Sequence, residues 1–228
     1  MSGLLFPDNG TCRVLNENPS KRRVSLLQQL FVLPEEVILP DVKASEYLKM
    51  YAPFYPSYNK EIEQKCIESF EIEISDNIQK MSFGQKKKVA ITMALAAHTP
   101  ILFMDEPTNG LDVPSKIMLR KLLALFTTQE QTIIISTHQI RELESLLDSI
   151  IILDDKGILF NKTIEEISTK FEFRKIEMGE EAFYSETFPN GTFGIIKNET
   201  GEKSPVSLEL FLNMAFTQKE KIKSLLNE

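Results

Sequence analysis

Three apolar segments of this 228-residue chain have the pattern of buried strands, and the stretches between them have the pattern of helices. The strand-like segments are ILFMD at 101–105, QTIIISTH at 131–138 and SIIILDD at 149–155, with VPSKIMLRKLLALFT and IRELESLLD between them. Continuous apolar strands are typical of parallel sheets that are covered on both faces. Helices that alternate with such strands supply right-handed crossovers. The pattern therefore predicts a layered α/β fold.

The overall composition limits the partners of the chain. Its residues are 42% hydrophobic and 26% charged, as in ordinary globular proteins. The formal net charge is −7 and the pI is about 5.1, so we expect no nucleic-acid partner bound through a basic surface. Cys12 and Cys66 lie far apart in the sequence, which favours a reducing compartment over a disulfide framework or a zinc site.

No segment has the length of a membrane span. The longest apolar stretch, at 89–104, is interrupted by His98, Thr99 and Pro100, whereas a spanning helix needs about 20 apolar residues. The N-terminus MSGLLFPDNG is broken by Pro7, which argues against a signal peptide. Any membrane role would therefore be peripheral.

The first 33 residues have a different pattern from the apolar segments. The Asn9-Gly10 pair is typical of a tight hairpin turn. The segment LFVL at 30–33 has the composition of a strand and ends at Pro34. We expect short strands and turns in this part of the chain.

A helical region follows. The segments at 43–51 and 59–70 place apolar residues three and four apart, which predicts two helices joined by the proline-containing YAPFYPSY. Ser82 predicts the N-cap of a further helix that ends before Pro100. These helices predict a helical subdomain at about 41–98.

After about residue 160 the pattern changes again. TIEEISTKF predicts a small helix, FEFRKIEM and TFGIIKNE predict strands around FPNG, and SLELFLNMAFTQKEKIKSLL predicts a terminal helix or helix pair. A tight turn is expected at Lys156-Gly157. We therefore expect a core at 1–160 and a small C-terminal subdomain at 161–228.

Three motifs resemble those of ATP-binding-cassette (ABC) ATPases, in the same order and spacing. MSFGQKKKVAITMALAAHTP at 81–100 is similar to the signature motif and its helix, ILFMDEPTNGLD at 101–112 to the Walker B strand and D-loop, and STHQ at 136–139 to the switch histidine. The resemblance covers roughly residues 1–160. It implies an α/β, P-loop NTPase-like ABC ATPase core, N-terminally incomplete, with a layered, mostly parallel sheet and a helical signature subdomain. A small C-terminal α+β appendix would follow.

Each motif also has a physical reading. Asp105 ends a strand at the sheet edge where α/β folds bind ligands, and there it can hold Mg²⁺, usually through water. Glu106 can orient or deprotonate the attacking water, and a neutral His138 can hydrogen-bond a γ-phosphate. An isolated Asp-Glu pair or a lone histidine is more often structural, but their strand context favours the functional reading. We interpret His98, at the end of an alanine-rich helix, as structural.

The signature-like segment begins with Ser82, Phe83, Gly84 and Gln85. At a helix N-terminus these residues offer backbone N–H groups and a favourable dipole to an anion. Phe83 stands where the common form of the motif has its first glycine. The lysines at 86–88 are interpreted as a solvated helix face.

The resemblance assigns two more residues to the nucleotide site. FVLPEE at 31–36 occupies the loop in which the family usually carries glutamine, and Glu35 stands at that position. This resembles a variant in the ATPases of two-component exporters, and a glutamate can still touch Mg²⁺ or water. Contacts to a membrane subunit would then involve the residues after Glu35 and the stretch around 41–58.

Asp112 ends the D-loop and is grouped with the nucleotide-binding residues.

The phosphate-binding sequence GxxxxGK[ST] does not occur in these residues. The nearest imitation, TGEKS at 200–204, lacks the upstream glycine and is expected to be a surface turn. Two explanations compete: a truncated chain, or a natural subunit that has lost this segment. Truncation is favoured, because losing a central strand would leave unpaired backbone groups and an exposed apolar edge.

The resemblance implies an ATP-hydrolysing subunit that uses ATP and Mg²⁺ and couples hydrolysis to export through a separate transmembrane permease. It would form a homo- or heterodimer of ATPase subunits and lie in the cytoplasm, peripherally on the inner face of the cell membrane. In such dimers the signature residues face the partner's nucleotide. Two alternatives stay open: a catalytically impaired regulatory or dimerisation subunit, and a soluble ABC ATPase.

Overall fold

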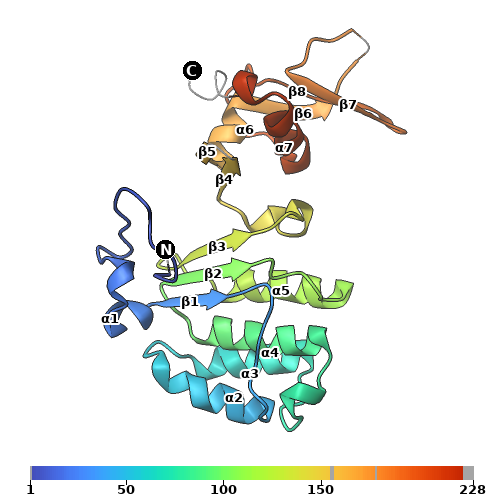
Figure 1. Cartoon of the computed structure of the whole chain (residues 1–228). Coiled ribbons are helices and arrows are strands. Elements are labelled where there is room, and N and C mark those ends of the chain that lie inside the picture. The colour runs from blue at the N-terminus through green and yellow to red at the C-terminus, as the bar shows by residue number, and fades with distance from the viewer. Residues whose placement is uncertain (1, 155–156, 178, 223–228) are drawn as a thin grey trace. The chain divides into compact units, whose positions relative to one another are not determined.

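The computed structural model describes residues 2–154, 157–177 and 179–222 (Figure 1). They form two compact units, residues 1–138 and 139–228. Among the described residues, none of the helices combines the length and the hydropathy needed to cross a bilayer. The domain boundary at residue 160 expected from the sequence stays a prediction.

The first unit is built on a parallel sheet with the strand order β1-β2-β3. Its strands are β1 (Leu30–Leu33), β2 (Ile101–Asp105) and β3 (Thr132–Ser136). The register pairs Leu33 with Met104 and Asp105 with Ser136, so the polar residues that follow β2 and β3 leave the sheet at the same edge. The predicted parallel pairing of these two apolar segments is confirmed.

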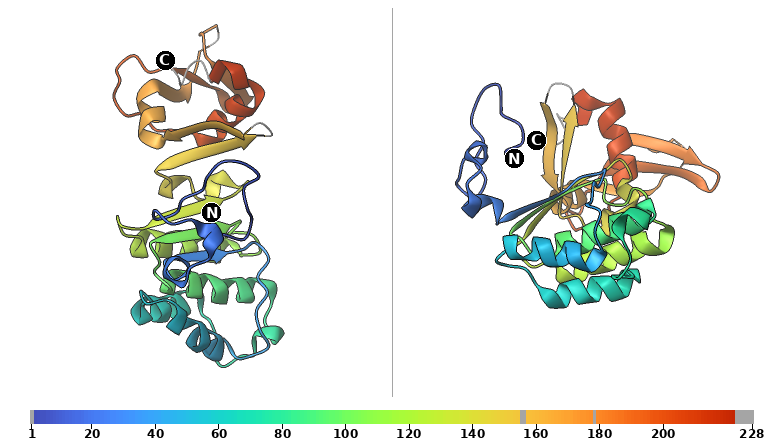
Figure 2. Two further views of the ribbon diagram at one scale, coloured as in Figure 1. Left: turned by 60° about the vertical axis from the view of Figure 1, so that its left-hand side comes forward. Right: turned by 60° about the horizontal axis from the view of Figure 1, so that its bottom comes forward.

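Four helices of the first unit lie on one side of this sheet (Figure 2). They are α2 (Ala44–Tyr51), α3 (Lys60–Phe70), α4 (Phe83–Ala96) and α5 (Val113–Phe126). Because the strand order advances in one direction, right-handed crossovers bring both connections to the same face. Leu102 and Met104 are buried on that face, whereas Val14 and Leu26 pack from the N-terminal segment beside Ile101. The helices predicted at 41–98 and the helix after the D-loop are confirmed.

Helix α4 is the central helix of the unit. Ser82 caps it, with its hydroxyl accepting from the backbone N–H of Gln85, and every residue from Val89 to Ala97 is buried. The helix ends where His98 takes a left-handed backbone conformation (φ +47°), two residues before Pro100. This left-handed exit closes the helix end, in agreement with a structural role for His98.

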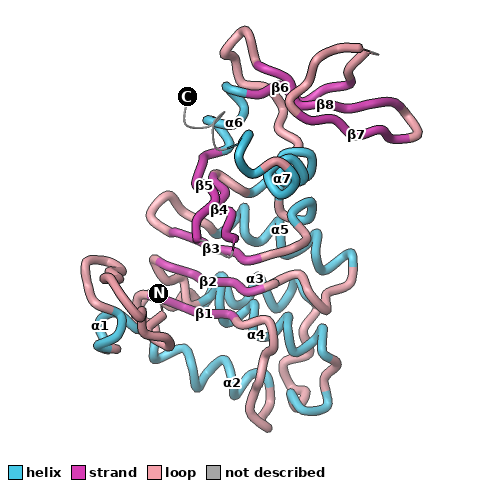
Figure 3. The backbone as a smooth tube through the Cα atoms, turned by 45° about the horizontal axis from the view of Figure 1, so that its top comes forward, coloured by secondary structure: helices cyan, strands magenta, loops and turns pink. Residues whose placement is uncertain are grey.

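Residues 2–29 differ from the prediction of short strands. They form a 3₁₀ turn at Pro19–Lys21, the short helix α1 (Val24–Leu27), and otherwise loop (Figure 3). Leu15 and Asn16 both have positive φ, which closes a turn where a strand would have to continue. The strand predicted at 30–33 is confirmed as β1.

The helix predicted at 140–148 is wrong. The structure has two 3₁₀ turns there, Ile140–Glu142 and Glu144–Leu146, with Leu143 buried between them. A parallel crossover usually needs a dozen or more residues and a helix. Instead, β4 (Ser149–Asp154) pairs antiparallel with β5 (Gly157–Thr163), so the third apolar segment does not join the parallel sheet. The turn predicted between them includes Lys156, which lies outside the described residues.

Helices α6 and α7 of the second unit pack with a three-stranded antiparallel sheet of order β6-β8-β7. Its elements are α6 (Ile164–Lys170), β6 (Phe171–Lys175), β7 (Tyr184–Phe188), β8 (Gly191–Lys197) and α7 (Leu208–Thr217). Phe171, Ile195 and Phe211 lie in its core. The predicted α+β character is confirmed, although the sequence did not indicate β7 as a separate strand.

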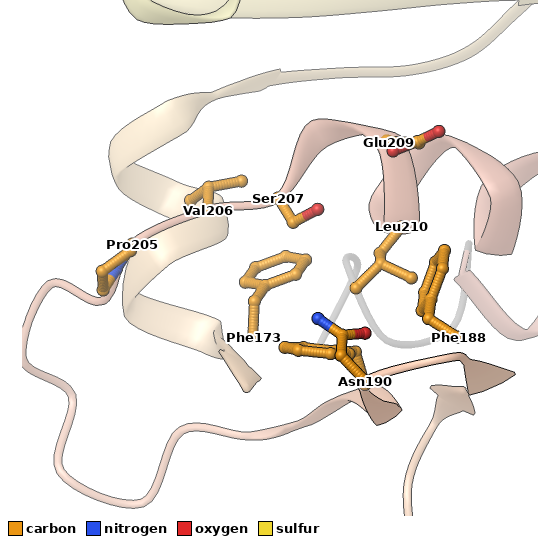
Figure 4. A pocket seen from close by; sticks show the side chains of 9 residues that line it. Phe173, Phe188, Asn190, Pro205, Val206, Ser207, Glu209 and Leu210 are labelled. Atoms are coloured by element: carbon orange, nitrogen blue, oxygen red, sulfur yellow. The ribbon is translucent and has the colours of Figure 1, made fainter. Parts of the chain in front are cut away.

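A pocket of about 410 Å³ opens in this second unit (Figure 4). Aromatic and aliphatic side chains from the sheet and from the start of α7 line it, together with three polar residues: Phe173, Phe188, Asn190, Phe193, Pro205, Val206, Ser207, Glu209 and Leu210. None of the residues that the sequence assigned to the nucleotide site lies in it.

Candidate functional site

The candidate site begins with the backbone of Glu106, directly after β2. Its N–H donates to the carbonyl of Ser136 on β3 at 3.0 Å. Its φ is +40°, in the left-handed region that a side-chain-bearing residue adopts at a cost of about 1–3 kcal/mol. The hydrogen bond to the neighbouring strand helps to hold this conformation, which turns the Glu106 carboxylate towards the end of β3.

There the carboxylate meets the two residues that follow β3. Oε1 of Glu106 lies 2.7 Å from Nδ1 of His138 and accepts the His138 backbone N–H at 2.9 Å. Oε2 accepts the Thr137 hydroxyl at 3.2 Å. The Glu106 side chain is only 14% exposed, whereas that of His138 is 67% exposed. The structure thus brings together two of the catalytic candidates, with the imidazole on the solvent side.

This contact determines which protons the imidazole carries. A carboxylate at 2.7 Å requires a proton on Nδ1. The neutral ring then presents Nε2 as an acceptor, and it donates to a phosphate oxygen only when it also binds a second proton. The sequence led us to expect that a neutral His138 hydrogen-bonds a γ-phosphate. In this arrangement, a hydrogen bond from Nε2 to the phosphate requires the ring to carry a second proton.

Asp105 lies at the same sheet edge and accepts a hydrogen bond from the Ser136 hydroxyl. Its carboxylate is exposed and suits Mg²⁺, which prefers oxygen ligands. Among residues 2–154, 157–177 and 179–222, no group of three or more His, Cys, Asp or Glu side chains is placed to hold a metal. Mg²⁺ usually keeps several waters and takes one or two carboxylates plus substrate phosphates, so Asp105 fits an ion bound together with a nucleotide.

Glu35 is tied to the turn that follows Glu106. Its Oε1 accepts from the Nδ2 of Asn109 at 2.8 Å, and the backbone N–H of Asn109 donates to the Glu106 carbonyl at 3.1 Å. Glu35 and Asn109 are 74 residues apart in the chain. The loop after β1 and the turn after β2 are therefore one connected structure.

Lys87 was expected on a solvated helix face, and this is wrong. The lysine is completely buried, and its Nζ donates to the carbonyls of Pro34 at 3.2 Å and Glu35 at 2.9 Å. Burial lowers the pKa of Lys87, and the nearby carboxylates of Glu35, Asp105 and Glu106 oppose that shift. The sequence carried one signal: three consecutive helical residues span more than half the helix circumference, so three lysines cannot all face solvent on a packed helix.

The start of α4 packs against the D-loop turn. Ser82 and Gln85 satisfy each other in a capping box, with the Ser82 N–H donating to Oε1 of Gln85 at 2.8 Å. A Cβ on Gly84 would lie 2.8 Å from the carbonyl oxygen of Gly110. A Cβ on Gly110 (φ +78°) would lie 2.1 Å from the ring of Phe83. Phe83 therefore rests on a position of the turn that only glycine fits.

Asp112 forms the N-cap of α5. Its carboxylate accepts from the backbone N–H of Ser115 at 2.9 Å. Hydrogen bonds from Ser115 hold the pKa of this carboxyl below its usual range. The cap fixes where the D-loop turn ends, and Asp112 remains exposed.

The distant imitation of a phosphate loop is a surface turn, as expected. The Asn198 side chain accepts from the backbone N–H groups of Thr200 and Gly201, and the segment is largely exposed. It lies in the second unit, whereas all the site residues described above belong to the first.

Comparison with known proteins gives concordant matches. A family model described as ABC transporter matches residues 1–109. The SkfA peptide export ATP-binding protein SkfE of Bacillus subtilis is 25% identical over 181 residues, which cover 77% of this chain and 75% of that protein. A protein of Caldanaerobacter subterraneus is 30% identical over 174 residues, which cover 68% of this chain and 69% of that protein. Its name describes it as an ABC transporter ATP-binding protein.

A solved structure shows the same fold. A dimeric ATP-binding cassette bound to ADP and phosphate aligns with a TM-score of 0.60 at 22% identity, covering 71% of this chain and 76% of that chain. At this identity the likeness concerns the fold.

Proposed function

This chain belongs to the ABC transporter family of ATP-binding proteins, and on that premise we propose that it couples ATP hydrolysis to export through a separate membrane permease. The observation that carries the proposal is the Glu106 carboxylate, held by His138 beside Asp105 at one sheet edge. The relative SkfE, whose name refers to peptide export, supports the direction of transport.

In this proposal the three residues divide the work of hydrolysis. Glu106 orients a water and takes its proton as the water attacks the γ-phosphorus, and the bond to the bridging oxygen breaks to release ADP and phosphate. His138 holds the carboxylate through Nδ1, and its Nε2 would donate to the γ-phosphate when the ring carries both protons. Asp105 would hold Mg²⁺, which would neutralise phosphate charge.

The signature-like segment would serve a second nucleotide, in a homo- or heterodimer. Ser82, Gly84 and Gln85 stand at the N-terminus of a 14-residue helix, where the dipole and backbone N–H groups favour an anion. The dimeric state of the ADP-bound structural neighbour supports this arrangement. Because the 228 residues contain no GxxxxGK[ST], the proposal needs a phosphate loop outside them for the nucleotide beside Asp105.

The permease would bind beside Glu35, with the protein peripheral on the inner face of the membrane. Apolar side chains are exposed in the region that the sequence assigned to this contact: Ile38 is 94%, Phe54 63% and Met50 53% exposed. Large apolar side chains exposed in this region support a protein contact there. The net charge of −7 argues against nucleic acid as the partner.

A second candidate function is a catalytically impaired subunit that completes only its partner's site. The lack of a GxxxxGK[ST] sequence favours it. The test measures ATP turnover by the full-length protein assembled with its dimer partner. If Asp105→Asn raises the Mg²⁺ requirement and lowers turnover, the chain hydrolyses ATP itself. If only Ser82→Arg lowers turnover, the second candidate holds, and if neither variant does, both are wrong.

A further inference from the structure

Lys87 is the most deeply buried charged side chain on α4, and nothing in the proposed chemistry uses it. Lysine is almost never fully buried unless it is paired, because an ammonium loses its hydration on burial. Here its Nζ donates to two backbone carbonyls, those of Pro34 and Glu35. Both residues lie in the segment that leaves β1 at the edge of the site.

Glu35 is held twice, from two different elements. Lys87 holds its backbone carbonyl at 2.9 Å, and Asn109 holds its side chain at 2.8 Å. The backbone N–H of Asn109 in turn donates to the Glu106 carbonyl. Three successive hydrogen bonds thus lead from α4 to the backbone of Glu106.

The charge of Lys87 also suits its surroundings. Its ammonium interacts favourably with Glu35, Asp105 and Glu106, all of which face the same edge of the sheet. A buried cation at this place offsets part of the repulsion among the three carboxylates. Lys86 on the same helix is half-exposed, whereas Lys87 is buried, which makes Lys86 a matched control.

We infer that Lys87 is a positioning residue for the hydrolysis site: it fixes the Pro34–Glu35 backbone and, through Asn109, the turn that carries Glu106. The inference rests on the proposed function for its effect on turnover. The hydrogen bonds of Lys87 and Asn109 can be tested without nucleotide. A failure of the positioning inference therefore does not imply a failure of the proposed function, and the reverse also holds.

The first arm measures hydrogen exchange of the backbone N–H of Asn109 in the full-length protein. Removing the Lys87 ammonium in Lys87→Met frees the Glu35 segment, and the amide should exchange about tenfold faster, equivalent to about 1.4 kcal/mol of lost protection. Lys86→Met should leave exchange unchanged, and Lys87→Arg should restore part of the protection, because arginine also donates to carbonyls. Equal exchange in Lys87→Met and Lys86→Met overturns the inference.

The second arm measures ATP turnover and keeps the test valid if Lys87→Met folds poorly. Asn109→Ala breaks the next link without touching the buried lysine. Each single variant should lower kcat with little change in KM, and the double variant should lose no more than the worse single variant, because both break one chain of contacts. Fully additive losses, or unchanged kcat alongside faster Asn109 exchange, overturn the positioning role.

Discussion

Nδ1 of His138 lies 2.7 Å from Oε1 of Glu106, although 32 residues separate them in the chain. The relationship follows from the sheet: β2 and β3 are parallel neighbours, and Asp105 pairs with Ser136. The residues just beyond each strand therefore leave the sheet side by side. One carboxylate oxygen accepts both the ring and the backbone N–H of the histidine, which fixes the carboxylate in one orientation.

The first prediction removes the imidazole. His138→Ala should lower ATP turnover about 100-fold, because Glu106 loses the group that orients it. The matched control is His98→Asn, which changes the other histidine and keeps a residue that tolerates its left-handed backbone. Steady-state ATPase rates of the two variants provide the measurement. Similar losses in both would show that the effect comes from general destabilisation.

A second prediction concerns the contact between Phe83 and the D-loop turn. Gly110→Ala should destabilise the first unit by about 1–3 kcal/mol, because the new Cβ meets the Phe83 ring and the backbone has φ +78°. Gly10→Ala is the control: its φ is also positive, but no atom lies within 4 Å of the added Cβ. Urea unfolding should show a larger loss at 110 than at 10, and Phe83→Ala should reduce the difference. An equal loss at both positions would refute the contact.

The two cysteines should differ in reactivity. Cys66 is fully buried on α3, and burial raises the pKa of its thiol to about 12, so it offers almost no thiolate at neutral pH. Cys12 is partly exposed. A thiol reagent followed by mass spectrometry should modify Cys12 alone in the native protein and both after denaturation. Rapid native modification of Cys66 would contradict the packing of α3.

The elements that the sequence predicted well carry their signals locally. Ser82 and Asp112 cap the helices that follow them, and apolar runs of four and three residues make up most of β2 and β3. Strand pairing is different, because an apolar run indicates a strand but not its partner. The segment at 149–154 is a strand as expected, yet it pairs with the next strand in the chain. The stretch at 140–148 has helical spacing and forms 3₁₀ turns that the short connection allows.

The candidate site shows the same division. Glu106 and His138 could be brought together from sequence, because each lies within two residues of the end of a strand in a parallel sheet. Helix geometry indicates that one of the three lysines faces the core, but it does not identify the partners of Lys87, because the carbonyls that it binds lie more than 50 residues away in the chain. The contact between Glu35 and Asn109 likewise joins two loops and leaves no periodic signal.

Lys87 should also give stability a distinctive dependence on pH. Burial lowers its pKa from the ordinary 10.5, so between the lowered value and 10.5 the unfolded chain binds more protons than the folded one. Its contribution to the free energy of unfolding therefore rises with pH across that window and is least favourable below it. Urea unfolding of wild type and Lys87→Met at several alkaline pH values tests the sign. The free energy of unfolding of the wild type, relative to that of Lys87→Met, should increase as the pH rises. A constant or opposite trend would contradict the burial of a charged lysine.

The account depends most directly on Glu106, and Glu106→Gln tests it in the full-length protein assembled with its dimer partner. Glutamine preserves the shape of the side chain but cannot accept a proton from water, so turnover should fall about 10²–10⁴-fold. ATP binding, measured in the same preparation by calorimetry, should stay close to that of the wild type. Near-wild-type turnover by the Glu106→Gln assembly would show that this carboxylate does not activate the water.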